Sequence, residues 1–191
     1  LCLSVTSVYI LKGVLNSRSE AISNLSMSED IIKQGEFIHE LQKERGYSAA
    51  FIANGKDSEK NLKEQRAKVD GIVKELSNKD AVFRVLSGIR AKVDKKEKFN
   101  LLGEYSGMIE NTLVFLNSLS KDAKPAIKDD VAMSFSISKI KEYYGITRAI
   151  MNVAFIKDEI DKNTYVNLIS HDANIKKLLN DYVKFNSGKY A

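Results

Sequence analysis

The chain contains few residues that cross-link a fold or interrupt a helix. Its 191 residues include one cysteine, Cys2, one proline, Pro125, and no tryptophan. A single cysteine excludes an internal disulfide framework and any cysteine-based metal cluster. The two histidines, His39 and His171, lie far apart without the spacing of zinc ligands. We therefore expect no bound metal, and the scarcity of proline favours long uninterrupted helices.

Long apolar runs and catalytic motifs are also missing. No stretch approaches the roughly 20 apolar residues that a transmembrane helix needs. The apolar start, residues 1–11, is either the end of a membrane span or an ordinary buried first helix. The chain has no glycine-rich phosphate loop, no Cys–His pair and no histidine base near a nucleophile. We expect neither an enzyme nor a bound cofactor.

The positive charge of the chain is diffuse. The formal net charge is +5, from 30 Lys and Arg residues against 25 Asp and Glu residues. Only six of the basic residues are arginines, and the lysines are spread along the sequence without a basic stripe interleaved with aromatics. Such a stripe is typical of nucleic-acid binding, which we therefore do not expect. A mildly cationic surface still attracts small anions over long distances.

The helical period of the apolar residues predicts an all-α fold. The expected helices cover about 5–25, 28–53, 58–76, 80–93, 101–119, 127–156 and 164–185. Ser28, Ser58 and Asp80 are placed to cap three of them, and a loop is expected around Pro125. Strand patterns and paired turn glycines are missing. Short links between long helices predict antiparallel neighbours in a bundle, within a single domain of residues 1–191.

An arginine interrupts the apolar face of the predicted helix 28–53. At 100° per residue, that face carries Ile38, Leu41, Ala49 and Ile52. Arg45 falls in the middle of the same face. A guanidinium is therefore expected where the pattern would place a leucine.

A second arginine follows the same pattern near the other end of the chain. Ile137, Ile140, Met151 and Phe155 share one face of the predicted helix 127–156, and Arg148 lies within that stripe. Tyr144 lies one turn before this arginine. We expect Arg148 to be buried with the stripe and Tyr144 to stand beside it.

A buried arginine needs an anion, because an unpaired buried charge is costly and arginine does not deprotonate. A structural interpretation pairs these arginines with carboxylates of the chain, for which Glu44, Glu142 and Asp70 are candidates. A functional interpretation brings the two arginines together around a small planar anion, which suits the planar fork of arginine. Residue pattern alone leaves both interpretations open.

Several segments resemble the NIT family, the nitrate- and nitrite-sensing domains of bacterial signalling proteins. Residues 41–48, Leu-Gln-Lys-Glu-Arg-Gly-Tyr-Ser, are similar to the family signature, and residues 141–149, Lys-Glu-Tyr-Tyr-Gly-Ile-Thr-Arg-Ala, are similar to its late motif. Stretches between them resemble further motifs in the right order, so that the resemblance covers about residues 30–185. One departure is Thr147, where the family usually has Glu.

The resemblance implies an all-helical fold of two stacked four-helix bundles and a nitrate or nitrite ligand. Carried over to this sequence, the ligand-binding arginines are Arg45 and Arg148. Arg66 and Arg90 match further motif positions. With two neighbours of the main arginines, the expected ligand-binding set is Arg45, Arg148, Ser48, Tyr144, Arg66 and Arg90.

Family members occur in chemoreceptors, histidine kinases, cyclases and a soluble antiterminator. The apolar start of the chain favours the periplasmic sensor domain of a membrane receptor, with a methyl-accepting chemotaxis protein as the preferred parent. Residues 1–25 would then continue from a transmembrane helix, and we expect a homodimer. Two alternatives remain open: a structural or dimerisation module whose arginines form internal salt bridges, and a sensor for a small organic carboxylate.

Overall fold

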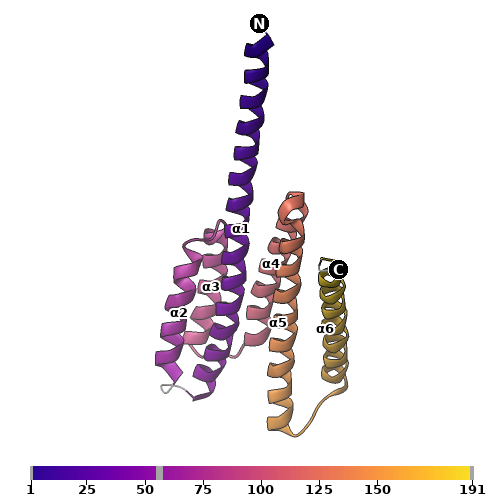
Figure 1. The fold of residues 1–191 in the computed structure, drawn as a ribbon. Helices are drawn as coiled ribbons and strands as arrows, with labels where there is room; N and C mark the ends of the chain where they lie inside the picture. The colour runs from indigo at the N-terminus through magenta and orange to yellow at the C-terminus, as the bar shows by residue number, and fades with distance from the viewer. Residues whose placement is uncertain (1, 55–57, 190–191) are drawn as a thin grey trace.

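The computed structural model describes residues 2–54 and 58–189, which form six helices and no strand (Figure 1). The helices are α1 (Cys2–Asn54), α2 (Glu59–Val73), α3 (Lys79–Asp94), α4 (Leu101–Asp122), α5 (Pro125–Lys157) and α6 (Lys162–Lys189). The all-α class predicted from the sequence is confirmed. None of the described helices carries a stretch long and apolar enough to cross a membrane.

The first helix is a single element of 53 residues, about 80 Å long at 1.5 Å per residue. The predicted break at Ser28 is wrong. Ile31 and Met27 belong to an apolar cluster with residues of α4 and α5, so this part of the chain is held helical by packing. Burial of an apolar face outweighs the local preference of a serine for a cap.

The helices α1 to α4 pack around one core, and α5 and α6 lie beside them (Figure 1). α1 contacts α2, α4 and α5, while α3 contacts α2 and α4. α5 also packs on α4, and α6 packs on α5. The described helices thus close one four-helix arrangement and leave α6 at its edge. A second, smaller apolar cluster forms where α1, α4 and α5 meet, around Ile31, Leu116 and Val131.

The helix ends follow local chemistry in part. Asn100 caps α4, because its side-chain oxygen accepts a hydrogen bond from the Gly103 amide at 2.9 Å. Pro125 is the first residue of α5 rather than part of a loop, a position where its missing N–H costs nothing. α3 begins at Lys79, before Asp80, and Asp158 ends α5 in the left-handed conformation. The expected fraying of residues 186–189 is not seen, since α6 extends to Lys189.

The core contains an unusual set of ionisable side chains. Its apolar part includes Leu41, Leu86 and Ile109, all fully buried. Glu44 and Arg45 lie within the same turn of α1 as Leu41 and are buried too. The C-terminal half of α1 therefore brings charged side chains into the centre of the bundle. In contrast, residues 10–23 of α1 are exposed and stand clear of the other helices (Figure 1).

Candidate functional site

Arg45 leaves α1 toward α5 and forms a buried ion pair there. Its Nη1 donates to Oε1 of Glu142 at 2.7 Å, and its Nη2 lies 3.4 Å from Oε2. Nη1 also donates to the hydroxyl of Ser106 on α4 at 2.6 Å. Arg45 is 6% exposed and Glu142 is 4% exposed. The prediction that Arg45 is a buried charge on an apolar stripe is confirmed, and its protein partner is one of the three named candidates.

A glycine makes room for this guanidinium. Gly145 lies on α5 beside Glu142, and a Cβ at that position would stand 2.9 Å from Nη2 of Arg45. Such a contact is shorter than a carbon and a nitrogen tolerate without displacement. The absence of a side chain at residue 145 is therefore a condition for the observed position of Arg45.

Arg45 also lines a hollow between α1 and α5, with a volume of about 570 Å³. Its lining residues, which define what we call the α1–α5 hollow, are His39, Gln42, Lys43, Arg45, Lys141, Tyr144, Gly145 and Arg148. Two lysines and two arginines are among them, and no carboxylate is. The hollow is thus suited electrostatically to an anion.

Arg148 enters the hollow from the solvent side. The sequence stripe predicted it to be buried, which is wrong: Arg148 is exposed, Tyr144 is 55% exposed and Phe155 is 76% exposed. The face of α5 that packs on α1 and α4 instead carries Val131, Ser138 and Glu142. Among the residues that the structure describes, Arg148 has no carboxylate within ion-pair distance, so its guanidinium is available to a ligand.

The charges around the hollow act on one another. Burial of the ring lowers the pKa of His39, and the positive charges of Lys141 and Lys43 lower it further. Burial also lowers the pKa of Lys141, with Lys43 adding to the effect. The Nδ1 of His39 lies 3.2 Å from the Lys141 ammonium. An anion bound here would relieve the mutual repulsion of these groups.

Three of the six expected ligand residues lie elsewhere. Arg90 of α3 holds the carboxylate of Glu44 with two bonds, Nε to Oε1 at 2.8 Å and Nη2 to Oε2 at 2.7 Å. Tyr105 donates to Oε1 of Glu44 at 2.9 Å, and Ser48 lies 3.0 Å from the same hydroxyl. Ser48 and Arg90 thus belong to a polar network inside α1–α4, apart from the α1–α5 hollow.

Arg66 borders the same network. Its Nη1 donates to Asp94 at 2.7 Å, whereas its Nε and Nη2 are buried without a hydrogen-bond partner among the described residues. Of the expected set, the structure therefore brings together Arg45, Tyr144 and Arg148 and separates Ser48, Arg66 and Arg90 from them.

Sequence reasoning missed part of the lining. His39, Gln42, Lys43 and Lys141 were not among the expected ligand residues. A usable signal exists in the spacing. Gln42 and Lys43 lie three and four residues after His39 on one face of α1, and Lys141, Tyr144 and Arg148 follow one another at intervals of three and four residues on α5.

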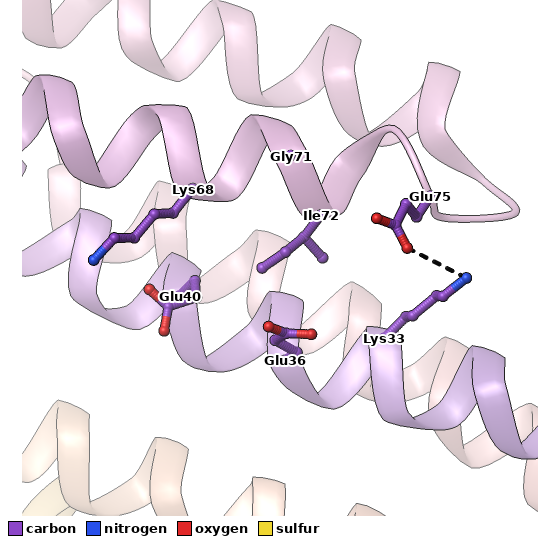
Figure 2. Close-up of a pocket in the computed structure, with 7 residues that line it drawn as sticks. All are labelled: Lys33, Glu36, Glu40, Lys68, Gly71, Ile72 and Glu75. Carbon is purple, nitrogen blue, oxygen red and sulfur yellow. Dashed lines mark ion pairs between the residues drawn. The ribbon is translucent and has the colours of Figure 1, made fainter.

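A second hollow of about 360 Å³ lies between α1 and α2, and Figure 2 shows the side chains that line it. Glu36 and Glu40 of α1 project beneath Lys68 of α2, and Lys33 pairs with Glu75 at 3.4 Å (Figure 2). Three carboxylates against two lysines leave this hollow with a slight negative excess. Its lining is therefore less suited to an anion than the lining of the α1–α5 hollow.

Comparison with known proteins assigns the chain to a family. The model of the NIT family, described as nitrate and nitrite sensing, matches residues 36–190, which include both arginine motifs. No curated protein and no solved structure matches the chain. The family match covers most of the sequence and agrees with the resemblance carried by residues 41–48 and 141–149. The chain belongs to the NIT family of nitrate- and nitrite-sensing domains and has a sensor role.

Proposed function

We propose that the α1–α5 hollow binds nitrate or nitrite between Arg45 and Arg148. One observation carries the proposal: two arginines far apart in the sequence line one hollow, together with two lysines and without a lining carboxylate. The family description supports the choice of ligand.

The two arginines would serve a planar anion in different ways. A guanidinium presents parallel N–H donors that match two oxygens of a flat anion. Arg45 is fixed in place by Ser106 and by its close approach to Gly145, whereas Arg148 is exposed and unpaired among the described residues. Arg45 would thus form the preset wall of the site, and Arg148 would close on the ligand. Tyr144 adds a hydroxyl at the rim.

Ligand binding would be transmitted through the packing of α1 against α5. Both arginines belong to these two helices, which contact one another directly. A ligand shifts a conformational equilibrium by binding one arrangement more tightly than the other. Nitrate held by one arginine from each helix would favour the arrangement in which the helices bring those arginines closest.

The test of ligand binding is a calorimetric and thermal-shift titration with nitrate, nitrite, chloride and acetate. We expect nitrate or nitrite to raise the melting temperature, because a ligand that binds only the folded state stabilises it. Arg148→Ala should abolish that rise without lowering the melting temperature of the free protein. Arg84→Ala removes an exposed arginine of α3 far from the hollow and is the matched control. A rise that survives in Arg148→Ala would contradict the proposed site.

The structure also favours a second candidate, a structural module whose arginines are occupied internally. The buried Arg45–Glu142 pair is the observation behind it. This candidate predicts that no anion raises the melting temperature, while Arg45→Ala lowers it strongly. The same titration separates the candidates, and a response to acetate alone would instead indicate a sensor for an organic carboxylate.

We further propose that the domain is a homodimer joined along the exposed part of α1. This part of α1 carries four apolar residues that are more than half exposed: Leu11, Leu15, Ile22 and Leu25. Their spacing follows the seven-residue repeat of a coiled-coil seam, in which Arg18 occupies the one seam position that is not apolar. Sedimentation equilibrium should give a dimer that Leu15→Lys combined with Ile22→Lys converts to a monomer. Val114→Lys, which alters an exposed apolar residue of α4, should leave the dimer intact.

In the cell, we propose that the domain is the periplasmic part of a membrane receptor, with a methyl-accepting chemotaxis protein as the preferred type. The long free part of α1 supports a role in connecting the sensor to another element (Figure 1). Alkaline phosphatase fused after α6 in the full-length protein should be active, because the enzyme matures only outside the reducing cytoplasm. An inactive but stable fusion would place the domain inside the cell.

A further inference from the structure

The guanidinium of Arg45 already holds a group with the shape of the proposed ligand. The carboxylate of Glu142 is a flat O–C–O unit with a delocalised negative charge, and one edge of nitrate is a flat O–N–O unit of the same kind. Oε1 and Oε2 of Glu142 accept hydrogen bonds from the two terminal nitrogens of Arg45, at 2.7 Å and 3.4 Å. An anion that binds Arg45 through the same fork therefore meets an occupied position.

The hold of Arg45 on Glu142 is uneven. Oε1 is close, while Oε2 is at the limit of a hydrogen bond to Arg45 and is held instead by the Gln42 amide at 2.9 Å. Gln42 itself lines the α1–α5 hollow, so one of the bonds that retain the carboxylate is at the edge of the space a ligand enters. A fork held by one short bond exchanges more readily than a fork held by two, such as Arg90 with Glu44 at 2.8 Å and 2.7 Å.

We propose that Glu142 is an internal competitor for the ligand site, whose carboxylate must leave Arg45 before a small anion binds there. The inference rests on the proposed function of the α1–α5 hollow and adds a regulating residue to it. In the free protein, Glu142 neutralises Arg45 and joins α5 to α1. In the bound protein, the ligand takes over the charge of Arg45, and the link between α1 and α5 passes from Glu142 to Arg148. Anion binding and helix packing thereby become one event.

The surroundings of Glu142 contain a destination for the displaced carboxylate. The charge of Glu142 acts on His171 of α6, whose Nδ1 is buried without a hydrogen-bond partner among the described residues. The hydroxyl of Thr147, five residues after Glu142 on α5, is also buried and has no hydrogen-bond partner among the described residues. A carboxylate that leaves Arg45 for this side would exchange a link to α1 for a link to α6.

If Glu142 competes with the ligand, its substitution should raise nitrate affinity, whereas substitution of a residue that binds the ligand would lower it. Glu142→Gln keeps the size and the oxygen of the side chain but removes its charge. Nitrate affinity measured by calorimetry should therefore rise by about tenfold or more, equal to about 1.4 kcal/mol. The nitrate-induced rise in melting temperature should also exceed that of the natural protein, although the free variant melts lower. Glu110→Gln, which removes an exposed carboxylate paired with Lys139 of α5, should change neither.

The outcomes separate this inference from the proposed function. Tighter binding in Glu142→Gln supports competition, even where the natural protein binds too weakly to measure. Equal or weaker binding in Glu142→Gln, with measurable binding in the natural protein, overturns the inference and leaves the site itself in place. No binding of any anion by either protein overturns both.

A measurement on the natural protein covers the case in which Glu142→Gln fails to fold. The carboxyl carbon of Glu142 can be followed by ¹³C-detected magnetic resonance during a nitrate titration. Departure from Arg45 should move this resonance, whereas the carboxyl carbon of Glu44, which Arg90 holds, should stay in place. Two unmoved resonances at saturating nitrate would overturn the inference.

Discussion

Glu44 and Arg90 are joined by two hydrogen bonds of 2.8 Å and 2.7 Å across 46 residues of sequence. The carboxylate of Glu44 has no exposed surface, and burial together with the negative charge of Glu44 raises the pKa of the neighbouring Tyr105 hydroxyl. Adjacent residues of α1 thus take part in two separate ion pairs: Glu44 with α3, and Arg45 with α5. The first pair lies within the bundle and the second at the hollow.

This position makes Glu44 a determinant of stability. Glu44→Gln should lower the free energy of unfolding by about 3 kcal/mol, because it leaves the buried guanidinium of Arg90 with one partner fewer. Urea denaturation measures the change. Lys176→Ala removes an ion pair between two exposed residues of α6 and should leave the denaturation midpoint where it was. Equal changes in the free energy of unfolding for the two substitutions would contradict the predicted contribution of Glu44 to stability.

Ser48 and Tyr144 should separate stability from ligand binding. Ser48 contacts Tyr105 inside the bundle, so Ser48→Ala should cost about 1 kcal/mol of stability and leave nitrate affinity unchanged. Tyr144 lines the hollow and is exposed, so Tyr144→Phe should weaken nitrate binding by about fivefold with no loss of stability. Calorimetry and urea denaturation on both variants provide the comparison. The reverse assignment of effects would move the ligand into the α1–α4 network.

A methyl group at residue 145 should displace Arg45. Gly145→Ala places a carbon 2.9 Å from Nη2 of Arg45, and we expect the displaced guanidinium to bind nitrate more weakly. Gly107→Ala is the matched control, since a Cβ there meets nothing within 4 Å. That variant should gain up to about 1 kcal/mol from the higher helix propensity of alanine and keep its affinity. Unchanged nitrate affinity in Gly145→Ala would show that the position of Arg45 is not critical.

The two histidines should make the free protein less stable in acid. Burial lowers the pKa of His39, with Lys141 and Lys43 adding to it, and burial lowers the pKa of His171 against an opposing effect of Glu142. The unfolded chain therefore takes up these protons at higher pH than the folded chain does. The contribution is present above about pH 6.5 and is lost as the pH falls through the lowered values.

Melting temperatures recorded at steps from about pH 7 to about pH 5.5 test this dependence. The variant carrying both His39→Gln and His171→Gln should show a flatter profile than the natural protein over that window. A natural protein that becomes more stable on acidification would contradict the lowered pKa values. Nitrate should partly offset the loss, because a bound anion favours the protonated form of His39.

The burial of Arg45 was predictable from sequence, but the identity of its carboxylate partner was not. The period of Ile38 and Leu41 fixes the side of α1 on which Arg45 lies, and that side is buried. Local pattern carries no information on which of several carboxylates approaches from another helix. Glu142 is 97 residues away, and its selection depends on how α5 packs against α1.

The position of Arg148 could not be derived from its own helix. α5 packs on α1 and α4 along one side and on α6 along another, so apolar residues occur on more than one face. A stripe that includes Ile137 and Phe155 is then as regular as the stripe that is buried. The family motif, rather than helical phase, predicted that Arg148 and Arg45 lie together, and both line the α1–α5 hollow.

The uninterrupted course of α1 limits the kinds of signal that it can convey. A helix without a break, kink or inserted turn has no joint at which a displacement is absorbed. A rotation of α1 about its axis at Arg45 would therefore be carried toward Leu11, about 50 Å away along the same helix. Bending would be opposed by every hydrogen bond along that length. In the proposed sensor, rotation of α1 is therefore a more direct output than bending.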